Sequence, residues 1–203
     1  MAGAIRIARE ADAAAILAIY GPFCSETTIS FEEHPPSLEE MRGRVFETLK
    51  LFPWLVCESE GAIWGYAYAS PHRERAAYRW SADVSVYIAA GHRRSGLGRA
   101  LYTSLFQILT LQGFYNVYAG ITLPNPGSVA LHEALGFRHV GIYKNVGYKH
   151  GTWHDVGWWQ RSIQPLEPAP KMPVAFQDVR ESRKFRDCLA TGQRCLLSAS
   201  QSS

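Results

Sequence analysis

The chain has 203 residues, of which 47% are hydrophobic and 12% aromatic. This length favours a single domain with a substantial core, and this composition excludes general disorder. The net charge of +3 is small, and no basic tract is interleaved with aromatic residues, so neither a nucleic-acid surface nor a membrane span is expected. The four cysteines lack metal-ligand spacing and no signal peptide is found, which favours free thiols and a cytoplasmic location.

The first half of the chain alternates strand and helix patterns. Ser37 and Glu40 have the spacing of a capping box, which places a helix start at residue 38. Glu60 and Gly61 separate two strand-like runs, as in the turn of a hairpin. We expect a strand at residues 5–9, a helix at 12–20 ended by Gly21 and Pro22, a helix at 38–50, hairpin strands at 54–58 and 63–69, and a long strand at 78–89.

The second half continues the alternation. Apolar residues between Leu97 and Leu111 recur at helical spacing, and Asn125 followed by Pro126 is typical of a helix N-terminus. We expect a helix at 98–112, a short helix between Asn125 and Gly136, and strands at 115–121, 140–146 and 156–163. Because the hairpins exclude a purely parallel sheet, the predicted fold class is α/β with a mixed sheet.

The character of the chain changes after Pro165. Prolines recur at positions 165, 168, 170 and 173, and residues 198–203 are rich in serine. This composition predicts a folded domain at residues 1–165 and a poorly ordered Pro/Ser-rich tail at 166–203. The alternative is that apolar residues of the tail dock on a partner, namely Cys188, Leu189, Leu196 and Leu197.

A glycine- and arginine-rich junction, residues 92–99, joins a predicted strand to a predicted helix. Gly96 and Gly98 allow backbone N–H groups to come close to a ligand, and the following helix N-terminus favours a phosphate. Neither a dinucleotide fingerprint nor a P-loop is present, which argues against dinucleotides and nucleoside triphosphates. The junction therefore predicts a different phosphorylated ligand, the alternative being a tight turn with solvated arginines.

Two residues stand out as candidates for proton transfer. Asp83 interrupts an apolar strand, and alternation places it with Ser81, Ser85 and Tyr87 on a face that should meet a polar cleft. Its alternative role is structural, as the partner of Arg75 or Arg79. His132 follows Asn125 and Ser128 on one helix face, where its alternative role is that of a surface or capping residue.

These motifs together resemble the GNAT superfamily of N-acetyltransferases. The junction is similar to that superfamily's acyl-coenzyme A pyrophosphate loop, and Asn125 through Phe137 is similar to its Asn–helix–Gly-Phe segment. Residues 77–80, 113–114, 131–137 and 147–157 narrow the resemblance to the phosphinothricin (methionine sulfoximine) N-acetyltransferase family, over residues 4–163. The resemblance implies a GNAT fold with a mixed, mostly antiparallel central sheet flanked by helices on both faces, acetyl-CoA as co-substrate, no metal and a homodimer.

The resemblance also assigns residues to acetyl-CoA. The phosphates are expected on the junction, at Arg93, Arg94, Ser95, Gly96, Leu97, Gly98 and Arg99. The pantetheine arm is expected along the preceding strand, at Val86, Tyr87 and Ile88, and near Asn125. An N-cap role is the alternative for Asn125, and both roles are compatible.

The resemblance further implies the chemistry and the acceptor. The family has a catalytic glutamate where this chain has Asp83, which is one methylene shorter, so the base acts through a bridging water, meets a closer substrate or is weakened. His132 corresponds to the group that protonates the departing thiolate in a direct transfer within a ternary complex. The acceptor pocket is implied at Phe31, Arg73, Arg75, Tyr78 and Val156, where arginines suit a phosphinothricin-like amino acid. Another amine acceptor (a protein N-terminus, a polyamine or an antibiotic) and a non-catalytic acyl-CoA-binding module are the alternatives.

Overall fold

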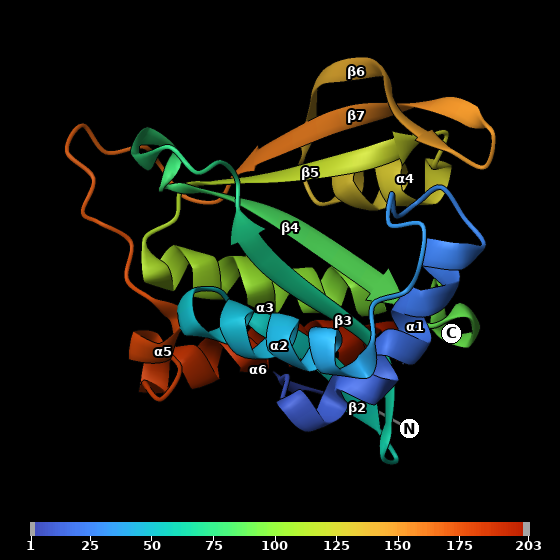
Figure 1. The fold of residues 1–203 in the computed structure, drawn as a ribbon. Helices are drawn as coiled ribbons and strands as arrows, with labels where there is room; N and C mark the ends of the chain where they lie inside the picture. The colour runs from blue at the N-terminus through green and yellow to red at the C-terminus, as the bar shows by residue number, and fades with distance from the viewer. Residues whose placement is uncertain (1–2, 201–203) are drawn as a thin grey trace.

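The computed structural model describes residues 3–200 and contains a seven-stranded sheet (Figure 1). The strand order is β1-β2-β3-β4-β5-β7-β6, and every neighbouring pair is antiparallel except β4 and β5, which are parallel. The predicted mixed, mostly antiparallel sheet is thus confirmed. The strands are β1 (Ala4–Ile7), β2 (Trp54–Ser59), β3 (Ala62–Pro71), β4 (Ser81–Ile88), β5 (Asn116–Leu123), β6 (Arg138–Lys149) and β7 (Thr152–Ser162).

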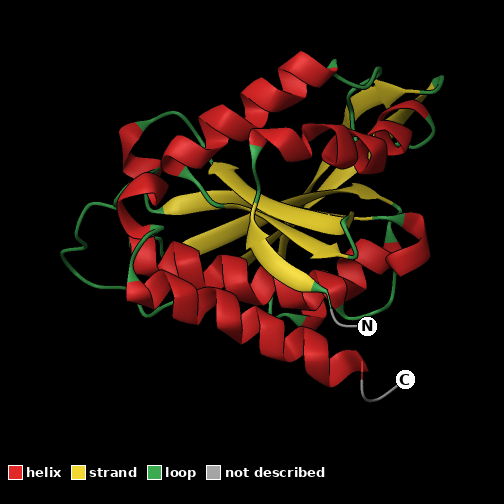
Figure 2. Cartoon of the chain, turned by 90° about the horizontal axis from the view of Figure 1, so that it is seen from below, coloured by secondary structure: helices red, strands yellow, loops and turns green. Residues whose placement is uncertain are grey.

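Helices cover both faces of the sheet, as expected (Figure 2). One core lies between the sheet and α1 (Ala13–Ser25) with α2 (Leu38–Leu51), and the other lies under α3 (Leu97–Gln112) and α6 (Arg183–Ser200). Strand β2 contributes alternate residues to the two cores. The short helices are α4 (Pro126–Ala134) and α5 (Phe176–Val179). Within residues 3–200, no helix is both long and apolar enough to cross a membrane.

A local capping signal sets the N-terminus of α2, whereas packing in the core sets the C-terminus of α1. At α2 the capping box is confirmed, because Ser37 Oγ accepts from the Glu40 N–H at 3.2 Å and the Glu40 carboxylate accepts from the Ser37 N–H at 2.6 Å. The expected end of α1 at Gly21-Pro22 is wrong, because the helix continues to Ser25. Phe23 and Cys24 are buried in the core, and this packing outweighs the backbone hydrogen bond that Pro22 cannot make.

The strands that frame the site differ from their predicted limits. Strand β4 begins at Ser81 rather than at residue 78, because a 3-10 turn, η2 (Ala76–Tyr78), precedes it. Strands β6 and β7 are longer than expected and form a hairpin whose turn places His150 and Gly151 at φ of 49° and 77°. The hairpin forms the outer edge of the sheet beyond β5 (Figure 1).

The expectation of a poorly ordered tail is wrong for the residues that the structure describes. Residues 176–179 and 183–200 form α5 and α6, and α6 packs along α3 and reaches β1. Phe176, Phe185, Cys188 and Leu196 are buried in the core that α3 shares, so the apolar side of α6 docks on this chain's own domain. Residues 201–203 of the expected tail lie outside the described residues.

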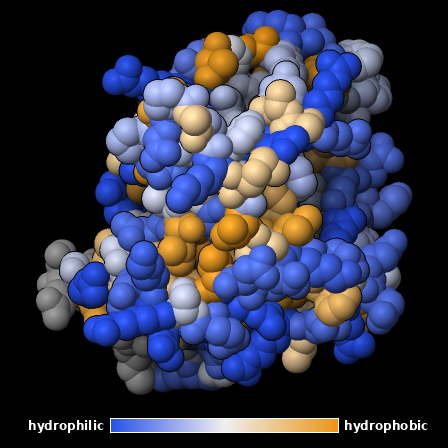
Figure 3. Space-filling model, turned by 90° about the vertical axis from the view of Figure 1, so that its left-hand side faces the viewer, coloured by the Kyte–Doolittle hydropathy of each residue, from blue (hydrophilic) through white to orange (hydrophobic). Residues whose placement is uncertain are grey.

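Close contacts fix α6 in place. A Cβ on Gly192 would lie 2.3 Å from the Ala100 carbonyl oxygen, so glycine permits α6 to approach the backbone of α3. Gln193 accepts from the Ile5 N–H at 2.8 Å and donates to the Gly3 carbonyl at 2.6 Å, which covers the backbone of the edge strand β1. On the face of the molecule seen in Figure 3, hydrophobic residues gather in the middle and hydrophilic residues surround them.

Candidate active site

The sheet opens at its centre, between β4 and β5. The two strands pair only at Ser81↔Asn116, Ala82↔Val117 and Asp83↔Tyr118, while β4 continues to pair with β3 and β5 with β7. They therefore diverge after Asp83 (Figure 1). Backbone groups on the open side of β4 lack a strand partner and are available to an extended ligand. A cavity of about 60 Å³ lies here, lined mainly by residues 84–87 of β4, residues 119–122 of β5, and Tyr102, Asn125, Ser128 and His132.

The loop between β4 and α3 has the backbone of an anion site. Arg94 and Gly96 have φ of 61° and 79°, and Gly96 is the N-cap of α3 without a side chain that could cap it. The first N–H groups of α3 are therefore free to meet a negatively charged ligand at the positive end of the helix dipole. A Cβ on Gly98 would lie 3.1 Å from Leu131 Cδ2, so this second glycine allows α3 to lie close to α4.

These features fit acetyl-CoA, which has a pyrophosphate and an extended arm. The start of α3 suits the phosphates, and the open edge of β4 suits the arm; Val86 and Tyr87 line the same cavity as Asn125. Asn125 Oδ1 accepts from the Ser128 N–H at 3.2 Å, which confirms its N-cap role. The individual coenzyme contacts assigned to the junction, to residues 86–88 and to Asn125 stay predictions.

His132 lies inside the protein rather than on its surface. It is 3% exposed, its Nδ1 lies 2.8 Å from the Ser128 carbonyl oxygen, and its Nε2 lies 3.2 Å from the Tyr102 hydroxyl. The carbonyl can only accept, so Nδ1 carries the proton and Nε2 accepts from Tyr102. Burial lowers the pKa of His132, and the bond to Ser128 opposes that shift. Burial also raises the pKa of Tyr102 well above its usual value, so the pair is neutral near pH 7.

The partner of Asp83 is His72, a pairing that no pattern in the sequence indicated. Asp83 Oδ1 lies 2.6 Å from His72 Nδ1, so the expected alternative of a pair with Arg75 or Arg79 is wrong. Burial raises the pKa of Asp83, while the hydrogen bond and the charge of His72 oppose the shift. The pair lies where β4 and β5 separate, because Asp83 is the last residue of β4 that pairs with β5.

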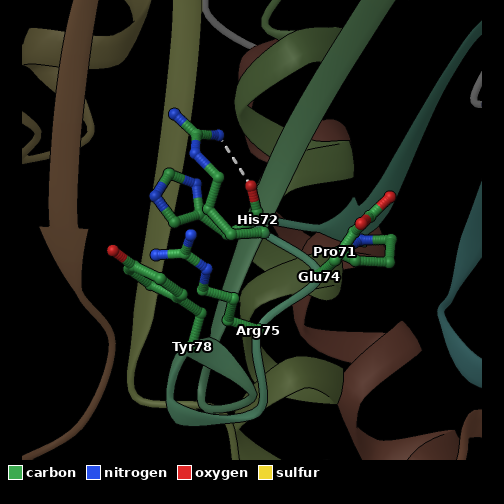
Figure 4. A pocket seen from close by; sticks show the side chains of 6 residues that line it. Pro71, His72, Glu74, Arg75 and Tyr78 are labelled. Carbon is green, nitrogen blue, oxygen red and sulfur yellow. Dashed lines mark hydrogen bonds between the residues drawn. The ribbon is translucent and has the colours of Figure 1, made fainter.

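A larger open cavity of about 740 Å³ borders this pair. It is lined by Pro71, His72, Arg73, Glu74, Arg75 and Tyr78. Figure 4 shows the His72 ring, the Arg75 guanidinium and the Tyr78 ring on one side of the loop, with Glu74 turned the other way. The cavity thus combines two cationic side chains, a phenol and an imidazole, a set that suits a small molecule with oxyanion groups.

The structure brings together three of the five expected acceptor residues. Arg73, Arg75 and Tyr78 line the cavity. Phe31 is 40% exposed and packs on Gly147, and Val156 pairs with Thr122 in the sheet, so neither of these lines it. Among residues 3–200, no three His, Cys, Asp or Glu side chains are close enough to hold a metal ion.

Two residues of the site, His72 and Tyr102, were not predicted from the sequence. His72 ends up beside Asp83 because β3 pairs with β4 at Ser70↔Asp83, a register that no local pattern reveals. Tyr102 lies within the helical pattern of α3 but faces α4, and only the packing of the two helices shows that its hydroxyl meets His132. A histidine that follows a predicted strand and precedes two arginines was the one available signal for His72.

Comparisons with known proteins agree with this geometry. The model of a family described as an acetyltransferase (GNAT) domain matches residues 5–158. The chain is 44% identical over 171 residues to phosphinothricin N-acetyltransferase of Streptomyces viridochromogenes, covering 84% of this chain and 93% of that protein. It is 34% identical to the L-methionine sulfoximine/L-methionine sulfone acetyltransferase of Pseudomonas aeruginosa, covering 84% of this chain and 100% of that protein.

A solved structure shows the same fold with a coenzyme. The GNAT superfamily phosphinothricin acetyltransferase of Sinorhizobium meliloti, in complex with AcCoA, is 37% identical and superposes with a TM-score of 0.79, covering 88% of this chain and 98% of that one. The open β4 edge, the uncapped start of α3 and these relatives lead to one conclusion. The chain belongs to the phosphinothricin and methionine sulfoximine N-acetyltransferase family of the GNAT superfamily and is an acetyl-CoA-dependent N-acetyltransferase.

Proposed function

We propose that the enzyme acetylates the amino group of phosphinothricin-like amino acids, with phosphinothricin and methionine sulfoximine as acceptors. This choice of acceptor rests on the cavity beside Asp83, which is lined by Arg73, Arg75 and Tyr78. A guanidinium pairs with planar or tetrahedral oxyanions through two hydrogen bonds, and such acceptors have both a carboxylate and a second acidic or polar group. The names of the related enzymes from Streptomyces and Pseudomonas support the same class.

The acceptor must lose a proton before it can react. An α-amino group has a pKa of about 8, so neutralising it at pH 7 costs roughly 1.4 kcal/mol. The Asp83–His72 pair places a proton acceptor at the edge of the cavity. Bound acetyl-CoA supplies the activated acetyl thioester, while the arginines hold the acceptor and limit its motion.

We assign the second proton transfer to His132 and Tyr102. The leaving thiolate needs a proton, and Tyr102 donates a hydroxyl hydrogen toward His132 Nε2 inside the cavity between β4 and β5. The Ser128 carbonyl fixes the hydrogen on His132 Nδ1, so Nε2 is the acceptor that orients the Tyr102 hydroxyl, and Tyr102 is the group that gives its proton to the thiolate. Direct transfer in a ternary complex fits this arrangement, in which one proton-transfer pair borders each of the two cavities.

A thiol-release assay tests the acceptor class. Purified enzyme and acetyl-CoA are combined with phosphinothricin, methionine sulfoximine, a polyamine, an aminoglycoside and a peptide with a free N-terminus. We expect turnover with the first two that exceeds the rate of the Asp83→Ala/His132→Ala double variant by at least tenfold. Turnover restricted to another amine would reassign the acceptor, and coenzyme binding without any turnover would favour a non-catalytic module.

We further propose that the enzyme is a cytoplasmic homodimer. Support for the dimer comes from the β6–β7 hairpin, where large apolar side chains are exposed, including Trp153 at 61% and Val140 at 62%. Exposed apolar side chains gathered on one hairpin are typical of an interface with another protein surface. Sedimentation of the purified enzyme at micromolar concentration should give twice the monomer mass, and a Trp153→Lys variant should sediment as a monomer.

A further inference from the structure

The ring of His72 is held on several sides. It stacks on Tyr118 at 4.1 Å between ring centroids and 14° between planes, and Tyr78 and Trp158 approach it edge-on at 5.9 and 6.0 Å. Tyr118 is the residue that pairs with Asp83 across the last rung between β4 and β5. The imidazole is thus fixed above the point at which the two strands separate.

The hydrogen bond to Asp83 determines which nitrogen of His72 is basic. The Asp83 carboxylate can accept but not donate when ionised, so Nδ1 of His72 carries the hydrogen of the 2.6 Å bond. The lone pair is then on Nε2, for which the structure shows no hydrogen-bond partner within residues 3–200. A carboxylate that holds one nitrogen of an imidazole and so orients the other toward the substrate is the arrangement that makes histidine an effective base, and here the Asp83 side chain is 27% exposed and that of His72 is 11% exposed.

The position of the pair relative to the cavity decides which group meets the acceptor. His72 lines the 740 Å³ cavity, whereas Asp83 does not, and one carboxylate oxygen of Asp83 is already bound to His72. The imidazole of His72 therefore lies between the short side chain of Asp83 and the cavity. Arg73 and Arg75 belong to the same loop as His72 and place positive charge at the cavity, where it attracts an acidic amino acid.

We propose that His72 is the catalytic base of this enzyme and that Asp83 is its positioning residue. This inference rests on the proposed function. His72 Nε2 takes one proton from the acceptor ammonium group, and the freed nitrogen lone pair forms the bond to the acetyl carbon. The carbon–sulfur bond breaks, the electron pair stays on sulfur, and the thiolate takes a proton from the Tyr102–His132 pair. The new amide nitrogen loses its second proton to water, and water returns a proton to the Tyr102–His132 pair. His72 then releases its proton to water through the open cavity.

Chemical rescue tests the assignment. In His72→Ala the ring is removed next to an open cavity, and free imidazole supplied in solution can take its place. We expect kcat at pH 7 to fall by about 10²–10⁴-fold, the effect of losing a general base, and the KM for acetyl-CoA to change little. Added imidazole should restore activity in proportion to its concentration, and substituted imidazoles should restore it according to their basicity. His34→Ala, which removes an exposed histidine that does not line the cavity, is the matched control.

The pH profile separates a base from a structural group. The charged and titratable groups around His72 are Asp83, Arg73, Arg75, Glu74, Tyr78 and Tyr118. In His72→Gln only the neutral amine can react, so kcat/KM should rise about tenfold per pH unit until the free amine titrates, whereas the wild type should depend less steeply on pH. Asp83→Asn should lower kcat without removing the histidine from the cavity, and Asp83→Glu should recover part of it.

The outcomes are distinguishable. If His72→Ala retains a rate within threefold of the wild type, or if imidazole has no effect while Asp83→Asn is inactive, Asp83 is the base and the inference is overturned. If the wild type itself acetylates neither amino acid, the proposed function fails and the rescue experiment moves to the amine that does react. Equal acetyl-CoA binding by wild type and variants in calorimetry shows that the variants are folded.

Discussion

The docking of α6 on the domain predicts a large effect of a substitution in a segment whose composition suggests disorder. Phe185 is 3% exposed, lies in the core shared with α3, and contacts Phe176 in a T-shaped arrangement with 5.7 Å between ring centroids. Truncation of a buried phenylalanine to alanine costs about 3–5 kcal/mol. In a protein of this size, each kcal/mol lowers the melting temperature by roughly 2–4 °C. Phe185→Ala should therefore melt roughly 6–20 °C below the wild type.

Differential scanning calorimetry measures this effect, with Lys184→Ala as the control on the exposed side of the same helix. The control should change the stability by less than about 0.5 kcal/mol. Hydrogen exchange should show slow amides in residues 185–196 of the wild type and faster ones in Phe185→Ala. A melting temperature within 2 °C of the control, together with fast exchange in the wild type, would refute the packing of α6 on α3.

Three further predictions concern the site. Tyr102→Phe removes the hydroxyl that reaches His132 Nε2, so steady-state kinetics should show kcat reduced by about 10²-fold or more with little change in the KM for the amino acid. Arg75→Ala should raise the KM for the amino acid about 10–100-fold, the loss of a charge-assisted hydrogen bond of about 1.5–3 kcal/mol, whereas Arg42→Ala on the surface of α2 should not. Burial lowers the pKa of His132 in the folded protein. As the pH falls below about 6.5, the unfolded chain therefore binds a proton at this histidine that the folded protein does not bind, and the free energy of unfolding decreases. Urea unfolding at pH 7.5 and 5.5 should therefore show a smaller loss for His132→Gln than for the wild type.

Local signals were sufficient to predict the elements at which we place the coenzyme. The glycines at 96 and 98 mark a turn whose backbone must take a positive φ and a helix that must lie close to its neighbour, and the structure shows both features. Asn125 and Pro126 mark the start of α4 through hydrogen bonding and fixed φ, which depend on neighbouring residues alone. Asp83 was identified as unusual because its charge conflicts with the apolar pattern of its strand.

Contacts between segments that are distant in the sequence could not be predicted from the pattern of residues along the chain. The partner of Asp83 depends on the register of β3 against β4, and the partner of His132 depends on how α3 packs on α4. The same holds for α6, whose apolar side is separated from the domain by a proline-rich segment that suggested a linker. In each case the deciding free energy comes from packing between elements, which spacing along the chain does not encode.

A crystal structure with coenzyme A and methionine sulfoximine tests the account most directly. It should place the α-amino nitrogen within about 2.6–3.2 Å of His72 Nε2. The carboxylate of the amino acid should lie against Arg73 or Arg75, and the thiol should lie between β4 and β5. An amino group that faces Asp83 through water, or an amino acid bound outside the cavity of residues 71–78, would contradict it.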